Sequence, residues 1–294
     1  MDDFKRNSIK YSIVIPCWFY DGQDGRYRED ETFWFAQECL SKLLLRLNPS
    51  SSTSSSSYTP TNQKSKSITT SSSSTRNYEI IIIDNGSTLT HFSEKGCMTL
   101  DLFWNSADVL IRNRTNLGFG PACNQGFAIA RGKYIICLNN DVIVWPGWIE
   151  ALTDVLEDKT LTPAPGVVMP ALMKQTKDAR DALQLKEIDL SSNFNKVGGG
   201  AEFGSCWMMK KTLMDEIKQK DGHVFNEEAF KLGFGEDRDL WDRVRRMGYQ
   251  TYRCHKTRVF HQGNMTIGKV PDRKKYTTVN REKLKQMIDE RNKD

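Results

Sequence analysis

Short, uninterrupted apolar runs alternate with longer amphipathic segments through the first half of the chain. Four runs are predicted to be strands: residues 11–16, 78–84, 108–112 and 134–138. Apolar runs of this length are typical of parallel strands that are covered on both faces. Residues 31–47 and 121–131 carry apolar side chains at helical spacing. This alternation predicts an α/β domain with a mostly parallel central sheet and helices on both faces.

The second half of the chain is less regular. Its predicted helices are residues 148–157, 211–220 and 236–247, and its predicted strands are residues 166–172, 203–210 and 249–254. A less regular helical region is expected from about residue 89 to residue 103. No internal repeat is evident, so these elements extend the same domain.

Two segments depart from this pattern. Residues 48–77 are nearly all Ser and Thr and cannot bury enough apolar area to offset the entropy of ordering. They are predicted to be a disordered insertion between a helix and a strand, which α/β units usually join by a short turn. Residues 269–294 are densely charged and are expected to form an exposed C-terminal helix or tail. The chain is therefore expected to hold one domain over residues 1–268 and a charged end.

Composition narrows the class of protein. The net charge of +5 does not require a nucleic-acid partner, and the mean hydropathy of −0.57 is lowered by the Ser-rich segment. The seven Cys residues form no CxxC pair, which disfavours a disulfide framework or a zinc cluster and favours a reducing compartment. No apolar leader or membrane-length apolar window is present, so a cytoplasmic location is expected.

Polar side chains stand at the ends of two predicted strands. Asp84 closes the second strand, and Asn139-Asn140-Asp141 interrupts an apolar region after the fourth. Ligands of open α/β sheets bind at the carboxyl ends of the strands. A buried carboxylate is unfavourable unless it is paired or binds a metal, so Asp141 is a candidate ligand for a hard divalent cation. The alternative for both sites is a turn closed by an Asx side chain.

Three further features carry candidate chemistry. Glycines from Gly118 onward precede a helix that carries Asn124, so backbone N–H groups there could approach a diphosphate, although an ordinary loop fits equally. Glu236 and Asp237 open a helix, either as a general base with its neighbour or as simple complements of the helix dipole. His261 ends an apolar run and is either a metal ligand or a structural histidine.

The order of these motifs resembles the family 2 inverting glycosyltransferases of GT-A fold, and within them the rhamnosyltransferase-like group. The resemblance rests on Pro16, Asp84-Asn85-Gly86-Ser87, Asn116 to Gly120, Leu138 to Asp141 with Trp148, Gly204 to Met209, Gly235 to Leu240, and His261. It covers residues 12–263 without the Ser-rich insertion. It implies a GT-A sheet with a smaller acceptor-side subregion.

The resemblance implies a role for each position. The nucleotide donor (a UDP-, dTDP- or GDP-sugar) is expected at Pro16, Asp84, Asn116, Gly118, Asn124, Asn139 and Asn140. A Mn²⁺ or Mg²⁺ ion is expected on Asp141 and His261, and Asp237 is the expected catalytic base with Glu236 as its neighbour or substitute. Trp148, Gly204, Ser205, Cys206 and Trp207 are expected to line the donor and acceptor pockets. Because Asn139 stands where an acid is usual, metal binding is expected to depend on the donor's diphosphate.

The implied activity is inverting transfer of a sugar to a hydroxyl of a glycan or glycoconjugate acceptor. Two alternatives remain. A metal-dependent sugar nucleotidyltransferase would need a basic glycine-rich loop after the first strand, where this chain has an aromatic stretch, residues 17–20. An inactive carbohydrate-binding relative would not need Asp141, Asp237 and His261 together.

Overall fold

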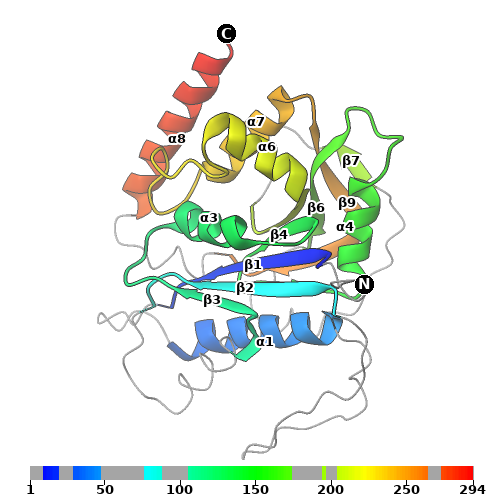
Figure 1. Ribbon diagram of the computed structural model, residues 1–294. Coiled ribbons are helices and arrows are strands. Elements are labelled where there is room, and N and C mark those ends of the chain that lie inside the picture. Colours follow the sequence, from blue (N-terminus) through cyan, green and yellow to red (C-terminus); the bar gives the residue numbers. More distant parts are fainter. Residues whose placement is uncertain are drawn as a thin grey trace, which may run out of the picture.

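The computed structural model describes residues 9–19, 29–47, 76–87, 105–173, 194–196, 204–263 and 273–293, and those residues form one nine-stranded sheet with helices on both faces (Figure 1). The sheet order is β3-β2-β1-β4-β8-β6-β9-β5, and β7 pairs with β9. The strands are β1 (Tyr11–Cys17), β2 (Tyr78–Asp84), β3 (Val109–Arg112), β4 (Tyr134–Leu138), β5 (Val142–Val144), β6 (Pro165–Leu172), β7 (Phe194–Lys196), β8 (Cys206–Lys210) and β9 (Gln250–His261).

Six of these strands (β1, β2, β3, β4, β6 and β9) run in one direction. The remaining strands β5, β7 and β8 pair antiparallel to their neighbours. All residues of β1, β2 and β4 are buried, as their unbroken apolar runs predict. The predicted α/β class with a mostly parallel sheet is confirmed.

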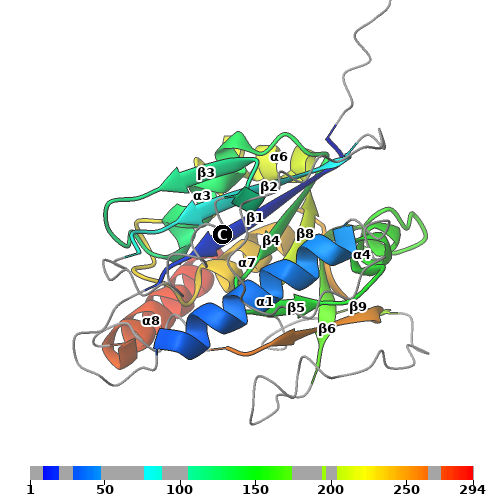
Figure 2. The same ribbon diagram turned by 90° about the horizontal axis from the view of Figure 1, so that it is seen from below.

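Helices form a layer on each side of the sheet. The helices α1 (Glu29–Leu47) and α4 (Trp148–Leu156) cover one face, and α3 (Phe119–Ile129), α6 (Lys211–Asp221) and α7 (Glu236–Arg246) cover the other (Figures 1 and 2). In α1 the buried side chains Ala36, Cys39, Leu40 and Leu43 follow helical spacing and form one apolar stripe. The last helix, α8 (Arg273–Arg291), lies beside α7.

Several predicted boundaries differ from the structure. The strand predicted at residues 249–254 continues to His261 and forms a single β9. Its pairing with β6 is irregular between Pro170 and Ala171 and continues after that point. β5 and β7 were not predicted, and each is only three residues long. The expected helix at residues 89–103 lies outside the described residues, as does most of the insertion at residues 48–77.

One edge of the sheet collects the polar motifs. The parallel strands β1, β2, β4 and β9 end there, and the antiparallel strands β5 and β8 begin there. Residues that follow the first group and residues that precede the second group therefore meet in space. None of the helices in the described part of the chain has the length and hydropathy of a membrane span.

Candidate functional site

A cavity of about 400 Å³ opens at this edge of the sheet. Its floor comes from residues 16–18 at the end of β1, residues 139–141 after β4 and residues 204–205 before β8. The walls are residues 232–238 at the start of α7, His261 at the end of β9, and Arg281 and Leu284 of α8. Ten of the predicted site residues line it: Pro16, Asn116, Asn139, Asn140, Asp141, Gly204, Ser205, Glu236, Asp237 and His261.

Asp141 and His261 form a pair at the cavity floor. Asp141 immediately precedes β5, and the antiparallel register of β5 with β9 places Val142 opposite His261. His261 Nε2 lies 3.1 Å from Asp141 Oδ1, and the backbone N–H of Gly263 donates to Asp141 Oδ2 at 3.2 Å. Burial alone lowers the pKa of His261, but the charge of Asp141 and their hydrogen bond raise this pKa above its ordinary value overall. Two residues 120 positions apart in the sequence therefore act as one polar unit.

Asn139 lies beside this pair. Its backbone N–H donates to Ser205 O at 2.8 Å, which fixes the strand end, while its buried side-chain Oδ1 has no hydrogen-bond partner in the described part of the chain. An unpaired buried acceptor in a cavity that also holds a carboxylate and an imidazole fits a hard or borderline divalent cation, which takes oxygen and nitrogen ligands. No group of three His, Cys, Asp or Glu side chains gathers among the described residues, so any such ion would have only the pair Asp141 and His261 at this place.

The amide of Asn85 organises another wall. Its Nδ2 donates to Asn116 Oδ1 and to Gly118 O, both at 2.9 Å, and its Oδ1 accepts from the backbone N–H of Leu117 at 3.1 Å. Asn85 and Asn116 both line the cavity. Gly118 itself is not among the lining residues; it caps α3 with a φ of 102°. The motif after β2 contains both Asp84 and Asn85, and the resemblance assigned the contact with the nucleotide to Asp84.

Asp84 occupies a different position from the one the sequence suggested. It is 2 % exposed and does not line the cavity. Its Oδ1 accepts from the backbone N–H of Ser87 at 3.0 Å, and its Oδ2 accepts from Arg112 Nε at 3.0 Å. These contacts agree with the alternative stated for Asp84, a turn closed by an Asx side chain.

Asn124 also lies outside the cavity lining. Its Nδ2 donates to Phe225 O at 2.8 Å and to Glu227 Oε1 at 2.6 Å, and its Oδ1 accepts from the backbone N–H of Phe225 at 3.0 Å. These three bonds tie α3 to the loop after α6. In this structure Asn124 therefore has a structural role and does not face the cavity.

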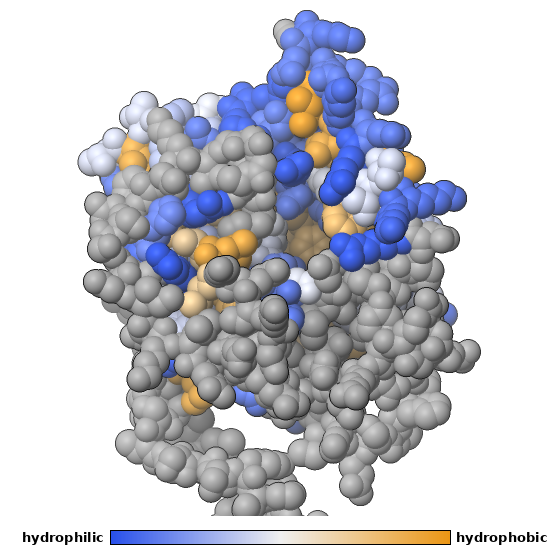
Figure 3. Space-filling view, turned by 180° about the vertical axis from the view of Figure 1, so that it is seen from behind, coloured by the Kyte–Doolittle hydropathy of each residue, from blue (hydrophilic) through white to orange (hydrophobic). Residues whose placement is uncertain are grey.

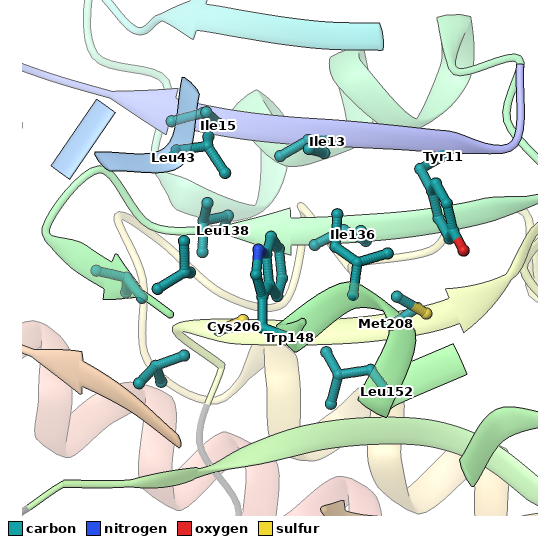
Figure 4. Packing of buried hydrophobic residues seen from close by; sticks show 14 of the residues in the cluster. Tyr11, Ile13, Ile15, Leu43, Ile136, Leu138, Trp148, Leu152, Cys206 and Met208 are labelled. Carbon is teal, nitrogen blue, oxygen red and sulfur yellow. The ribbon is translucent and has the colours of Figure 1, made fainter. Parts of the chain in front are cut away.

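Three predicted pocket residues are core residues instead. Trp148 begins α4, is 2 % exposed and points into the buried cluster, with Leu138 and Ile136 on its two sides (Figure 4). Cys206 and Trp207 are fully buried in β8, and none of the three lines the cavity. Strand alternation explains the positions of Cys206 and Trp207, because the residues after Ser205 turn alternately into the two packed faces of the sheet.

Glu236 and Asp237 begin α7 and line the same cavity. Gly235 precedes them with a φ of 114°, and negative charge is favourable at this end of a helix. Glu236 is 3 % exposed, and burial raises its pKa to about 8, with the charges of Asp237 and Asp239 adding to the effect. Asp237 is half-buried at the cavity, where its Oδ1 accepts from the backbone N–H of Arg238 at 2.8 Å. A neutral Glu236 leaves the negative charge of the pair on Asp237.

Replacing Glu236 by Gln is expected to raise the melting temperature more at about pH 8.5 than at about pH 5. Glu236 is neutral in both states well below its ordinary pKa of 4.5. Between that value and about 8, the unfolded state ionises while the folded state resists, so the wild type loses stability that the Gln variant keeps. Thermal melts across this pH range measure the difference, with the exposed Glu282→Gln as control. A constant difference between Glu236→Gln and wild type at all pH values would contradict the assignment.

Gly204 leaves the room that Asp237 occupies. A Cβ at residue 204 would lie 2.8 Å from Asp237 Oδ2 and 3.1 Å from Asp237 Cβ. Gly204→Ala is therefore expected to displace the carboxylate and to lower turnover by about 10- to 100-fold while the fold persists. Gly222→Ala is the matched control, because its φ of 80° strains an alanine but nothing lies within 4 Å of the added Cβ. Equal turnover of the Gly204→Ala variant and wild type would show that this close approach is unimportant.

The sequence did not single out several lining residues. They are Cys17, Trp18, Asn85, Phe119, residues 232–235, Arg238, Arg281 and Leu284. Trp18 and Phe119 carry no polar signal, and the contribution of α8 depends on tertiary packing. No local pattern in the sequence reports that a terminal helix returns to the site.

The sequence of this chain matches a known protein family. The family profile described as "Glycosyl transferase family 2" matches residues 65–218, more than half of the chain. The chain belongs to glycosyltransferase family 2. The match ends before α7. The family profile therefore does not cover the acidic pair, His261 or α8, and their roles are argued from the geometry of this chain.

Two curated relatives agree with the family. An uncharacterised glycosyltransferase of Haemophilus influenzae is 27 % identical over 183 residues, which is 58 % of this chain and 52 % of the relative. The glycosyltransferase GlyG of Streptococcus pneumoniae is 26 % identical over 168 residues, which is 52 % of this chain and 54 % of GlyG. The matched part of this glycosyltransferase-family chain thus spans about half the length of either relative.

Solved structures confirm the GT-A fold. GalNAc-T7 with UDP, GalNAc and Mn²⁺ superposes with a TM-score of 0.55 at 15 % identity, covering 94 % of this chain and 49 % of that one. Residues 1–349 of S. aureus TarS superpose with a TM-score of 0.52 at 11 % identity, covering 94 % and 69 %. At these low sequence identities, the structural similarity concerns the fold alone.

Proposed function

We propose that this protein transfers a sugar from a nucleotide-diphosphate sugar to an acceptor hydroxyl, with inversion at the anomeric carbon and with the help of a divalent metal. The observation that carries the proposal is that one cavity is lined by Asp141 and His261 and also by Asp237. A leaving-group site and a base that face the same cavity are what a displacement at a bound sugar needs.

The donor is assigned to the floor and to the Asn85 wall. Asn116 and Asn140 offer amide groups that suit a base, a ribose or a diphosphate, Trp18 offers an aromatic face, and Asn85 holds Asn116 in place. Three structures of this fold support a nucleotide-sugar donor by their descriptions: TarS in complex with UDP-GlcNAc, a mannosyltransferase of Pyrobaculum calidifontis with GDP-Man and Mn²⁺, and GalNAc-T7 with UDP, GalNAc and Mn²⁺.

The metal is assigned to Asp141 and His261, with Asn139 Oδ1 at hand. A bound Mn²⁺ or Mg²⁺ would offset the negative charge that develops on the departing diphosphate. Because the chain supplies so few ligands there, metal and nucleotide are expected to bind together.

Asp237 is assigned as the general base. It accepts the proton of the acceptor hydroxyl while that oxygen forms a bond to the anomeric carbon, and the bond from this carbon to the diphosphate oxygen breaks. No covalent bond to the protein forms. Glu236, neutral near pH 7, keeps a second charge away from this step and can donate a hydrogen bond.

A sugar nucleotidyltransferase is the second candidate, and the aromatic Trp18 after β1 disfavours it, because that reaction needs donors for a triphosphate at this place. A carbohydrate-binding protein without activity would not need the Asp237 wall. Transfer of a deoxysugar such as rhamnose and a glycan or glycoconjugate acceptor remain predictions from the resemblance, and a cytoplasmic location remains a prediction from the sequence pattern.

A screen of UDP-, dTDP- and GDP-sugars with Mn²⁺, Mg²⁺ or EDTA tests the proposal. One donor class is expected to raise the melting temperature only when metal is present and to be hydrolysed slowly in the absence of an acceptor. Formation of a sugar nucleotide from a nucleoside triphosphate and a sugar phosphate would favour the second candidate. Binding of oligosaccharides without any nucleotide effect would favour the third.

A further inference from the structure

The last helix, α8, closes the acidic wall of the cavity. It lies beside α7 (Figure 1), and in the view of Figure 3 the upper part of the molecule shows mostly hydrophilic residues with a strip of hydrophobic ones. Its residues Arg281 and Leu284 line the cavity. The family match ends at residue 218, so nothing in that match describes this helix.

The turn before Glu236 has an unfavourable backbone. Leu232 and Phe234 have φ values of 62° and 73°, in the left-handed region that non-glycine residues rarely adopt. Gly233 and Gly235, with φ values of 135° and 114°, complete four consecutive residues of positive φ. Such a conformation persists only where the surroundings impose it.

Asn280 of α8 supplies that constraint. It is 1 % exposed, and its Nδ2 donates to Lys231 O at 2.9 Å and to Gly233 O at 2.6 Å. Both N–H bonds of one amide are therefore used on two carbonyls of the turn. Asn is a poor residue for the interior of a helix, so its presence here is better explained by the contact than by helix propensity.

Other contacts hold α8 in place independently of Asn280. Leu284 packs with Ala229 and Phe230, just before the turn. At the far end of the helix, Arg291 Nη2 lies 2.5 Å from Asp239 Oδ1, and Arg246 Nη1 donates to Arg291 O at 2.7 Å. Loss of Asn280 alone is therefore expected to free the turn without releasing the helix.

We propose that Asn280 is a positioning residue that holds the turn of residues 231–235 in its left-handed path and thereby places Asp237 at the cavity. The inference rests on the proposed function for the role of Asp237, but the constraint on the turn is a property of the protein alone. Asn280 acts through the backbone and touches no substrate.

Two substitutions separate hydrogen-bond donation from packing. Asn280→Ala removes the amide, and Asn280→Asp keeps its size but replaces the donor by an acceptor facing two carbonyls. With the sugar nucleotide that stabilises the wild type most, and with Mn²⁺, both are expected to lower kcat for donor hydrolysis by about 10- to 100-fold while KM for the donor stays within about twofold. Arg246→Ala is the control, because it weakens the far end of α8 without touching the turn.

Hydrogen exchange of the protein alone gives the second readout. Amides of residues 231–239 are expected to exchange faster in both Asn280 variants than in wild type, and to be unchanged in Arg246→Ala. An Asn280→Asp variant with wild-type kcat and wild-type exchange would overturn the proposal, as would an equal loss of kcat in Arg246→Ala. If no sugar nucleotide is hydrolysed by the wild type, the proposed function fails, and the exchange of residues 231–239 still decides whether Asn280 holds the turn.

Discussion

Asp237→Asn is expected to lower the rate of sugar transfer and of donor hydrolysis by about 10²- to 10⁴-fold, the range that a positioned general base contributes. The amide keeps the size of the side chain but cannot accept the hydroxyl proton. Donor affinity is expected to stay unchanged, because the donor is assigned to residues other than Asp237. Steady-state kinetics with the donor found in the screen, together with titration of the nucleotide diphosphate, measure both quantities.

Two controls make this result specific. Asp215→Asn removes an exposed carboxylate that pairs with Lys211 on α6, and it is expected to leave kcat unchanged. Glu236→Gln preserves the neutral form that prevails near pH 7, and it is expected to cost much less than Asp237→Asn. Donor hydrolysis that survives Asp237→Asn undiminished would remove Asp237 as the base.

Asp141→Ala is expected to abolish the metal-dependent part of donor binding. Asp141 and His261 are the two candidate metal ligands, so the variant should bind a nucleotide diphosphate at least about 10-fold more weakly in Mn²⁺. In EDTA the variant and wild type should bind it equally. The readout is the shift in melting temperature as the nucleotide is titrated with each metal condition, which does not depend on turnover.

His261→Ala is expected to behave like Asp141→Ala. His255→Ala is the matched control, because it removes an imidazole from the same strand, β9, at a position that does not line the cavity. Metal-dependent stabilisation that persists in Asp141→Ala, or activity unchanged in EDTA, would contradict the metal assignment.

The sheet was predictable because burial on both faces leaves a strong signal in each strand. The unbroken runs of β1, β2 and β4 needed no tertiary information. Short strands carry little signal: β5 has three residues and forms only because β9 extends past it. The pairing of Asp141 with His261 depends on that extension, so the residues suggested each of them separately and only the resemblance placed them at one metal site.

The errors at the site have a common physical origin. Motifs fix which residues stand near a strand end, but the alternation of the strand fixes which of them face the cavity. Ser205 lines the cavity while Trp207 packs inside, and Asn85 lines it while Asp84 turns toward Arg112. The role of Asn280 could not be predicted from the sequence for another reason. Its hydrogen-bond partners are backbone carbonyls that lie 47 and 49 residues away along the chain.

The parallel pairing of β1 and β2 has a practical consequence. Tyr78 begins β2 opposite Tyr11, at the edge of the sheet remote from Asn85, and seven residues of strand separate the two edges by about 20 Å. The long connection between α1 and β2 leaves Leu47 and rejoins the described chain at Arg76, on that remote edge. A fluorescent reporter attached at Arg76 would thus stand at the edge of the sheet away from the reacting groups.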